Sequence, residues 1–176
     1  LLGGCDRNDS QPVRFSPVSE ELFDEGGALT DAWADVDLDG DPDRFVGFNG
    51  TPSRLYRNDG IDGFVDIAPE VGLTTERSVR TSAWGDFDSD GDPDLLLGYS
   101  GEEPVIALWK NNGATFTEVS EMVGLRIVSG TTRQAAWVDV DADGDLDLFL
   151  AMRDGPNHLF IQTAGKFKNE AHNLGL

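Results

Sequence analysis

Fifteen aspartates of this 176-residue chain fall into three short segments of identical spacing, Asp-x-Asp-x-Asp-Gly-Asp-x-Asp. Alternate aspartates in a tight loop can turn their carboxylates toward one centre, and the glycine permits the positive φ of a sharp turn. Carboxylate oxygens without histidine or cysteine favour Ca²⁺ or Mg²⁺ over zinc or copper, and six or seven flexible ligands favour Ca²⁺. We therefore expect three calcium sites, one in each segment.

By analogy with other oxygen-rich calcium loops, positions 1, 3, 5 and 9 provide side-chain oxygens and position 7 a backbone carbonyl. The predicted side-chain ligands are Asp35, Asp37, Asp39 and Asp43 in the first loop, Asp86, Asp88, Asp90 and Asp94 in the second, and Asp139, Asp141, Asp143 and Asp147 in the third. The predicted carbonyl donors are Asp41, Asp92 and Asp145. An EF-hand is excluded because it needs a glutamate at position 12, where this chain has Val46, Leu97 and Leu150.

The sequence around these loops repeats with them. A tryptophan stands two residues before each loop, at intervals of 51 and 53 residues: Trp33, Trp84 and Trp137. These tryptophans are expected to pack in the protein core, and a short apolar run after each loop is expected to form a buried strand. A second landmark begins with phenylalanine and ends in Gly-Leu, at Phe64, Phe116 and Phe167, with a fainter copy at Phe15. The repeat unit is therefore about 50 residues.

Each repeat contains about four strand-like segments, and turns such as Asn112-Gly113 predict hairpins between them. We predict an all-β fold of β-propeller-type blades, each with four antiparallel strands and one calcium loop. Three blades are expected, over residues 24–73, 74–125 and 126–176, preceded by an extra N-terminal strand at residues 13–19. Residues 13–176 would form a single repeat domain, and residues 1–12 an N-terminal tail.

This combination of loop pattern and period resembles the FG-GAP/VCBS-type repeats of integrin α-subunit-like β-propellers. The resemblance covers the chain from about Phe15 to Leu176, and all three loops match the motif at every position. It implies that each blade binds one Ca²⁺ ion in its loop, with a structural role for the ion. Such propellers have about seven blades, whereas this sequence contains three full repeats.

The composition limits the classes of function. Against 33 acidic residues stand 13 Lys plus Arg, a formal charge of −20. This charge argues against binding to nucleic acid or to anionic lipid surfaces. The single cysteine excludes an internal disulfide, and no apolar run approaches the roughly 20 residues that span a bilayer. No phosphate-binding glycine loop or nucleophile elbow occurs, so no enzymatic activity is expected.

The N-terminal residues suggest export. Leu2-Gly3-Gly4-Cys5 resembles the lipobox of bacterial lipoproteins. Two interpretations stay open: Cys5 carries a lipid anchor, which would be the chain's membrane contact, or it is a free thiol in a polar tail. Asn8 and Asn49 begin N-x-S/T sequons and are candidate glycosylation sites. We expect an extracellular or cell-surface location.

The function expected from these observations is that of an exported, calcium-stabilised structural or adhesive protein. It would act by self-association or by binding another protein or a glycan at the cell surface. A blade array leaves two uncovered ends, so head-to-tail contacts could build a ring or a filament. The alternative is a fragment of a larger propeller that serves as a ligand- or glycan-binding ectodomain, or as the scaffold of a secreted polysaccharide-active enzyme.

Overall fold

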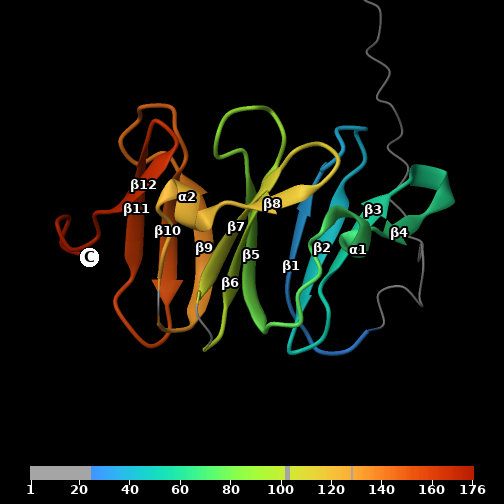
Figure 1. Ribbon diagram of the computed structural model, residues 1–176, viewed down its shortest axis with the longest axis horizontal. Helices are drawn as coiled ribbons and strands as arrows, with labels where there is room; N and C mark the ends of the chain where they lie inside the picture. The colour runs from blue at the N-terminus through green and yellow to red at the C-terminus, as the bar shows by residue number, and fades with distance from the viewer. Residues whose placement is uncertain (1–24, 102–103, 128) are drawn as a thin grey trace, which may run out of the picture.

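The chain forms three four-stranded antiparallel sheets that stand side by side (Figure 1). The computed structural model describes residues 25–101, 104–127 and 129–176. The first blade contains β1 (Ala28–Ala34), β2 (Asp43–Phe48), β3 (Arg54–Asn58) and β4 (Phe64–Asp66). The second contains β5 (Val79–Gly85), β6 (Asp94–Tyr99), β7 (Ile106–Asn111) and β8 (Phe116–Glu118). The third contains β9 (Thr132–Val138), β10 (Asp147–Met152), β11 (His158–Thr163) and β12 (Lys166–Asn169).

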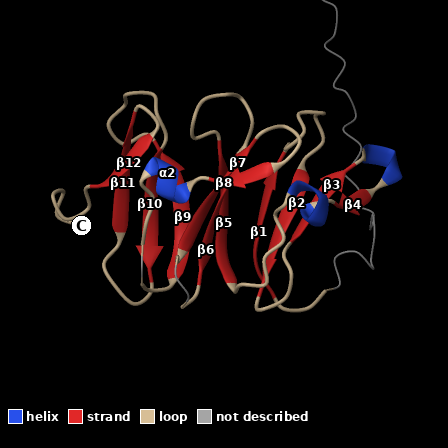
Figure 2. Cartoon of the chain, viewed as in Figure 1, coloured by secondary structure: helices blue, strands red, loops and turns tan. Residues whose placement is uncertain are grey.

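Within each blade the strands pair in chain order, and every pair is antiparallel. In the part of the chain that the structure describes, helical structure is confined to single turns: η1 (Gly60–Asp62), α1 (Ala68–Val71) and α2 (Ser120–Val123) (Figure 2). This arrangement confirms the predicted all-β fold with three blades of four strands. The predicted extra strand at 13–19 lies outside the described residues, and the domain boundaries remain a prediction.

Most of the apolar core lies between the blades; a smaller buried cluster of Val46, Phe48 and Tyr56 belongs to the first blade alone. One buried cluster joins the first and second blades and includes Phe45, Leu55, Leu95 and Leu97. A second joins the second and third blades and includes Leu96, Leu108, Leu148 and Phe160. The middle strand β6 is buried along its whole length because it has a blade on each side. Each blade therefore depends on its neighbour for burial, as in other repeat proteins.

The three tryptophans do not share one environment. Trp84 and Trp137 pack against the two inter-blade clusters, as expected. Trp137 also donates a hydrogen bond from its indole nitrogen to the carbonyl of Ala83 in the preceding blade (3.3 Å). Trp33 is 51% exposed, because the first blade has no blade before it among the described residues. The expected core position is therefore wrong for Trp33.

Glycines allow the blades to approach closely. A Cβ added to Gly98 in β6 would lie 2.6 Å from the Thr81 methyl and 2.7 Å from Cβ of Thr132 in the next blade. Gly47 has the same role in the first blade, where an added Cβ would lie 2.6 Å from Cβ of Val79. The sequence motif contains these glycines, but only the packing of neighbouring blades explains them.

Replacing Gly98 with alanine is expected to lower the free energy of unfolding by about 1–3 kcal/mol, because the added methyl overpacks a rigid joint. Urea denaturation in saturating calcium measures this loss. Gly155→Ala is the matched control, since no atom lies within 4 Å of a Cβ at that position. Equal stability of the two variants would contradict a close-packed joint.

Candidate metal centres

The three aspartate loops connect the first two strands of each blade and share one backbone path. The carboxylate at position 1 accepts a hydrogen bond from the glycine N–H at position 6, in the pairs Asp35–Gly40, Asp86–Gly91 and Asp139–Gly144 (3.0, 3.0 and 3.2 Å). The carboxylate at position 5 accepts one from the N–H of position 7, in the pairs Asp39–Asp41, Asp90–Asp92 and Asp143–Asp145 (2.9, 3.0 and 2.9 Å). The loop glycines have φ of +100°, +97° and +99°, as their place in the motif predicted.

Position 4 of each loop is also left-handed, with φ of 60°, 59° and 60° at Leu38, Ser89 and Ala142. Such a residue costs about 1–2 kcal/mol when it is not glycine. Sequence reasoning missed this feature because leucine, serine and alanine carry no signal for it. Hydrogen bonds within each loop, which recur in all three blades, must offset this backbone strain.

Each loop gathers three carboxylates into a cluster that could hold a cation. One oxygen from each member lies within 4.8 Å of the others in the sets Asp35, Asp37 and Asp39; Asp86, Asp88 and Asp90; and Asp139, Asp141 and Asp147. Two ligands on opposite sides of a Ca²⁺ ion are about 5 Å apart, since each lies 2.3–2.6 Å from the ion. Oxygen donors at this spacing fit Ca²⁺. The ion would supply positive charge to a cluster of carboxylates that otherwise repel one another.

The aspartate at position 9 is buried and clamps the loop onto its blade. Asp43, Asp94 and Asp147 are each at most 1% exposed. One oxygen accepts from the N–H of position 2, at Val36, Phe87 and Val140 (2.8, 3.0 and 2.9 Å). The other accepts from the last or next-to-last residues of the third strand, at Asn58, Asn111 and Gln162 (2.7, 2.8 and 2.8 Å). Only Asp147 also belongs to one of the three-carboxylate sets above, so ligation by all three residues remains a prediction.

Burial changes the ionisation of these clamps. It raises the pKa of Asp94 to about 7, although the two backbone N–H bonds act in the opposite direction. Burial also raises the pKa of Asp43, and in the third loop desolvation and the nearby Asp143 raise the pKa of Asp141. A cation beside such groups favours their charged form. The electrostatics of the loops thus fit a bound divalent ion as well as their geometry does.

Two loops are also held by the blade that follows them. The Asn111 side-chain amide donates to the carbonyl of Val36 in the first loop (3.0 Å). The Gln162 amide donates to the carbonyl of Phe87 in the second loop (3.0 Å). Both amides are buried. Sequence reasoning missed these residues, although an amide side chain recurs at this position in all three repeats and could have signalled them. These two aspartate loops are therefore parts of the blade joints.

Replacing Gln162 with methionine is expected to cost about 1–2 kcal/mol of stability, because the buried carbonyl of Phe87 loses its donor. Chemical denaturation in calcium measures the effect. Gln134→Met serves as the control, since Gln134 is exposed on the outer side of the third blade. If the two substitutions cost the same, the amide bond does not hold the joint.

One loop contains a basic side chain. Lys110 Nζ contacts the carboxylates of Asp88 and Asp90, the latter at 2.8 Å. The hydrogen bonds that Lys110 donates to Asp88 and Asp90 raise the pKa of Lys110, and the bond that Asp90 accepts from Lys110 lowers the pKa of Asp90. The equivalent residue of the first blade, Arg57, instead pairs with Asp59 (2.6 Å). The three loops therefore differ in their electrostatic surroundings despite their common backbone.

The other predicted sites are only partly described. Asn49 is exposed just after β2, in a position that a glycosylating enzyme could reach, and its side-chain oxygen accepts a hydrogen bond from Ser78 (2.7 Å). Cys5 and Asn8 lie outside the described residues, so their lipidation and glycosylation remain predictions. No helix among the described residues is long and apolar enough to cross a membrane.

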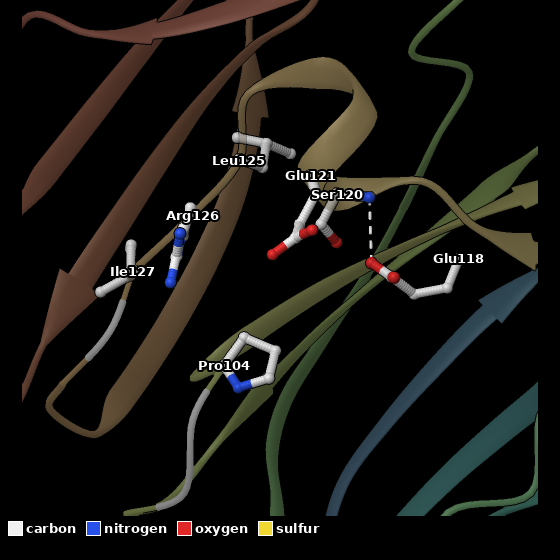
Figure 3. Close-up of a pocket in the computed structure, with 7 residues that line it drawn as sticks. All are labelled: Pro104, Glu118, Ser120, Glu121, Leu125, Arg126 and Ile127. Atoms are coloured by element: carbon white, nitrogen blue, oxygen red, sulfur yellow. Dashed lines mark hydrogen bonds between the residues drawn. The ribbon is translucent and has the colours of Figure 1, made fainter.

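A groove of about 380 Å³ lies beside α2 (Figure 3). Ser120 is its most nucleophilic residue, but its buried hydroxyl accepts a hydrogen bond from the N–H of Leu108 (2.7 Å). Glu118 accepts from the N–H of Ser120 (2.9 Å). The Ser120 side chain joins α2 to β7, and the Glu118 side chain holds the turn between β8 and α2. Their hydrogen bonds have a structural explanation, so the groove supports no catalytic assignment.

Comparison with known proteins agrees with this geometry. A family model described as FG-GAP-like repeat matches residues 35–97 and again 86–150, so that each match begins at position 1 of an aspartate loop. No curated protein matches the chain. Repeats of this family are typical of extracellular proteins and serve mainly structural and ligand-binding roles. The matches span most of the chain and confirm the resemblance found in its motifs: this protein belongs to the FG-GAP-like repeat family.

Proposed function

We propose that this protein is an exported structural or adhesive module whose blades are held in place by three Ca²⁺ ions. The observation that carries the proposal is the position of two of the three carboxylate clusters at the blade joints. The first two loops accept a buried amide hydrogen bond from the next blade. Closing a loop around an ion would therefore also stabilise the packing of neighbouring blades.

The outer face of the first blade is the surface that best suits a partner. Trp33 is half exposed there and packs edge-on against Phe64, with ring centroids 6.3 Å apart. The Arg44 guanidinium lies over the indole at 5.6 Å from its centre, and Arg44 pairs with Asp31 (3.4 Å). An aromatic ring with charged groups around it offers both stacking and hydrogen bonds, which suits a protein or a glycan.

Head-to-tail association of identical copies is less favoured than binding of a different partner. A head-to-tail contact would place Trp33 on the outer face of the third blade of another copy. There Ala151 stands at the position of Gly47 and Gly98, the glycines at the two joints of this array. A Cβ at either glycine would lie 2.6 Å from a neighbouring side chain, so the alanine obstructs the same docking. We therefore favour a separate protein or glycan partner over a ring or filament.

Light scattering in calcium and in chelator tests this preference, and a monomer is expected in both. A calcium-dependent oligomer would instead support assembly into a ring or filament. Binding of the labelled protein to a glycan array and to intact cells of the source organism tests the partner. Trp33→Ala should abolish that binding and leave the melting temperature within a few degrees. Equal binding by the two proteins, or none by either, would overturn Trp33 as the contact.

A second candidate is a ligand- or glycan-binding ectodomain, or the scaffold of a polysaccharide-active enzyme, within a longer propeller. The same outer faces favour it, because each inner face of this array is covered by a neighbouring blade. Sequencing the complete gene would test it: further repeats or a catalytic domain would support this candidate, and their absence would exclude it.

A further inference from the structure

A basic side chain, Lys110, contacts the second aspartate loop. Lys110 precedes Asn111, whose backbone N–H is bonded to Asp94 of the loop (2.8 Å). This bond places the lysine next to the carboxylates. Its ammonium group contacts Asp88 and Asp90, two of the three residues that form the cation cluster of this loop. The ammonium therefore contacts the carboxylates that a metal ion would use.

The first loop has a comparable basic residue, but a neighbouring carboxylate holds it away. Arg57 makes two hydrogen bonds to Asp59, of 2.6 and 3.2 Å. In the second blade the residue equivalent to Asp59 is Asn112, which has no charge to attract Lys110. In the third blade the residue equivalent to Lys110 is Ile161, which has no charge itself. Among the described residues, the second loop is thus the one whose cluster is paired with a basic side chain.

We infer that Lys110 is a built-in competitor that makes the second loop the weakest of the three calcium sites. The inference rests on the proposed calcium-dependent function. An incoming ion must break both lysine contacts or share the carboxylates with a positive charge. In the first loop Arg57 acts on Asp37 only through space, because its ion pair is with Asp59, and the third loop has Ile161 at this position. Two partly exposed ion pairs of ordinary strength correspond to about a tenfold loss of affinity.

The same lysine has the opposite effect when calcium is absent. Its ammonium then neutralises part of the repulsion within the second loop, so this loop keeps its shape better than the other two. As calcium falls, the second loop empties first and the lysine takes the place of the ion. The middle blade, which packs against both neighbours, thereby remains ordered over a wider range of calcium concentration.

Calorimetric titration of the whole chain with Ca²⁺ tests the inference. The wild type should show two tighter sites and one about tenfold weaker. Lys110→Ile, which copies the third blade, should bring the weak site to the affinity of the others. Arg57→Ile is the matched control and should change every site by less than twofold, because Arg57 is bound to Asp59 and acts on the first loop only through space. Three equal sites in the wild type, or a weak site that Lys110→Ile leaves unchanged, would overturn the inference.

Thermal melting separates competition from a simple structural role. Lys110→Ile should lower the melting temperature in chelator and leave it equal or higher in calcium near the affinity of the weak site. A structural lysine would lower it in both conditions, and that result would count against competition.

Asp59→Asn should free Arg57 to reach the first loop and weaken a second site. Absence of any binding heat in all of these proteins would overturn the calcium function itself, not only the role of Lys110.

Discussion

Removing calcium with excess chelator is expected to lower the melting temperature by about 20 °C. Each loop crowds several carboxylates, and two such charges 4 Å apart repel by roughly 4 kcal/mol at an effective dielectric constant near 20. A ligand at about 100 times its dissociation constant stabilises the folded state by about 2.7 kcal/mol per site. With the second site about tenfold weaker, the three sites contribute about 7 kcal/mol together. A domain of this size loses about 2–4 °C for each kcal/mol.

Differential scanning calorimetry in millimolar calcium and in chelator measures this shift. Mg²⁺ should restore only part of it, because Mg²⁺ requires a small octahedral site and gives up its water reluctantly. Identical melting curves in calcium and chelator would refute a folding role for the ion. The same outcome would remove the basis for both proposals made above.

Replacing Asp94 with alanine is expected to lower the free energy of unfolding by about 3–5 kcal/mol. Asp94 is fully buried, and its carboxylate accepts from the N–H groups of Phe87 and Asn111. The substitution leaves both donors unpaired beside a cavity, at about 1–3 kcal/mol for each donor. Alanine also removes the cost of burying the Asp94 charge, a cost that appears as the raised pKa of Asp94. The net loss of stability is therefore smaller than the summed energies of the two hydrogen bonds.

Urea denaturation in saturating calcium measures this loss. Asp92→Ala is the matched control within the same loop: its predicted contribution is a backbone carbonyl, which alanine retains, and its side chain is partly exposed. We expect the control to lose less than about 1 kcal/mol, as surface substitutions do. If Asp92→Ala costs as much as Asp94→Ala, position 9 is not the clamp that its hydrogen bonds indicate.

The repeat pattern alone predicted most of the fold. Tryptophan, aspartate loop, apolar run and phenylalanine recur in a fixed order, and each has a local physical meaning: a turn that needs glycine, a strand buried on both faces, a hairpin. Such signals depend on short stretches of chain, so they can be recognised without knowing the packing. They led to three blades of four antiparallel strands, which the structure confirms.

Contacts between blades could not be predicted in the same way. Gly98 and Gly47 are small because the next blade approaches them closely, and the distance between blades is not encoded in either residue. The amides of Asn111 and Gln162 reach carbonyls 75 positions away in the chain. Trp33 has the same sequence context as Trp84 and Trp137, yet its exposure differs because no described blade covers it.

The sequence by itself determined the chemistry of the aspartate loops: the hard oxygen donors, their spacing and the glycine turn are all local, and the excess of negative charge is a property of composition. Only the tertiary structure decided how the three loops differ. Asp94 became a buried clamp because strand β7 lies against its loop. Lys110 contacts its loop while Arg57 does not, because Asp59 binds the arginine and an asparagine replaces that carboxylate in the second blade. Identical motifs acquire different electrostatics from neighbours that only folding brings into contact.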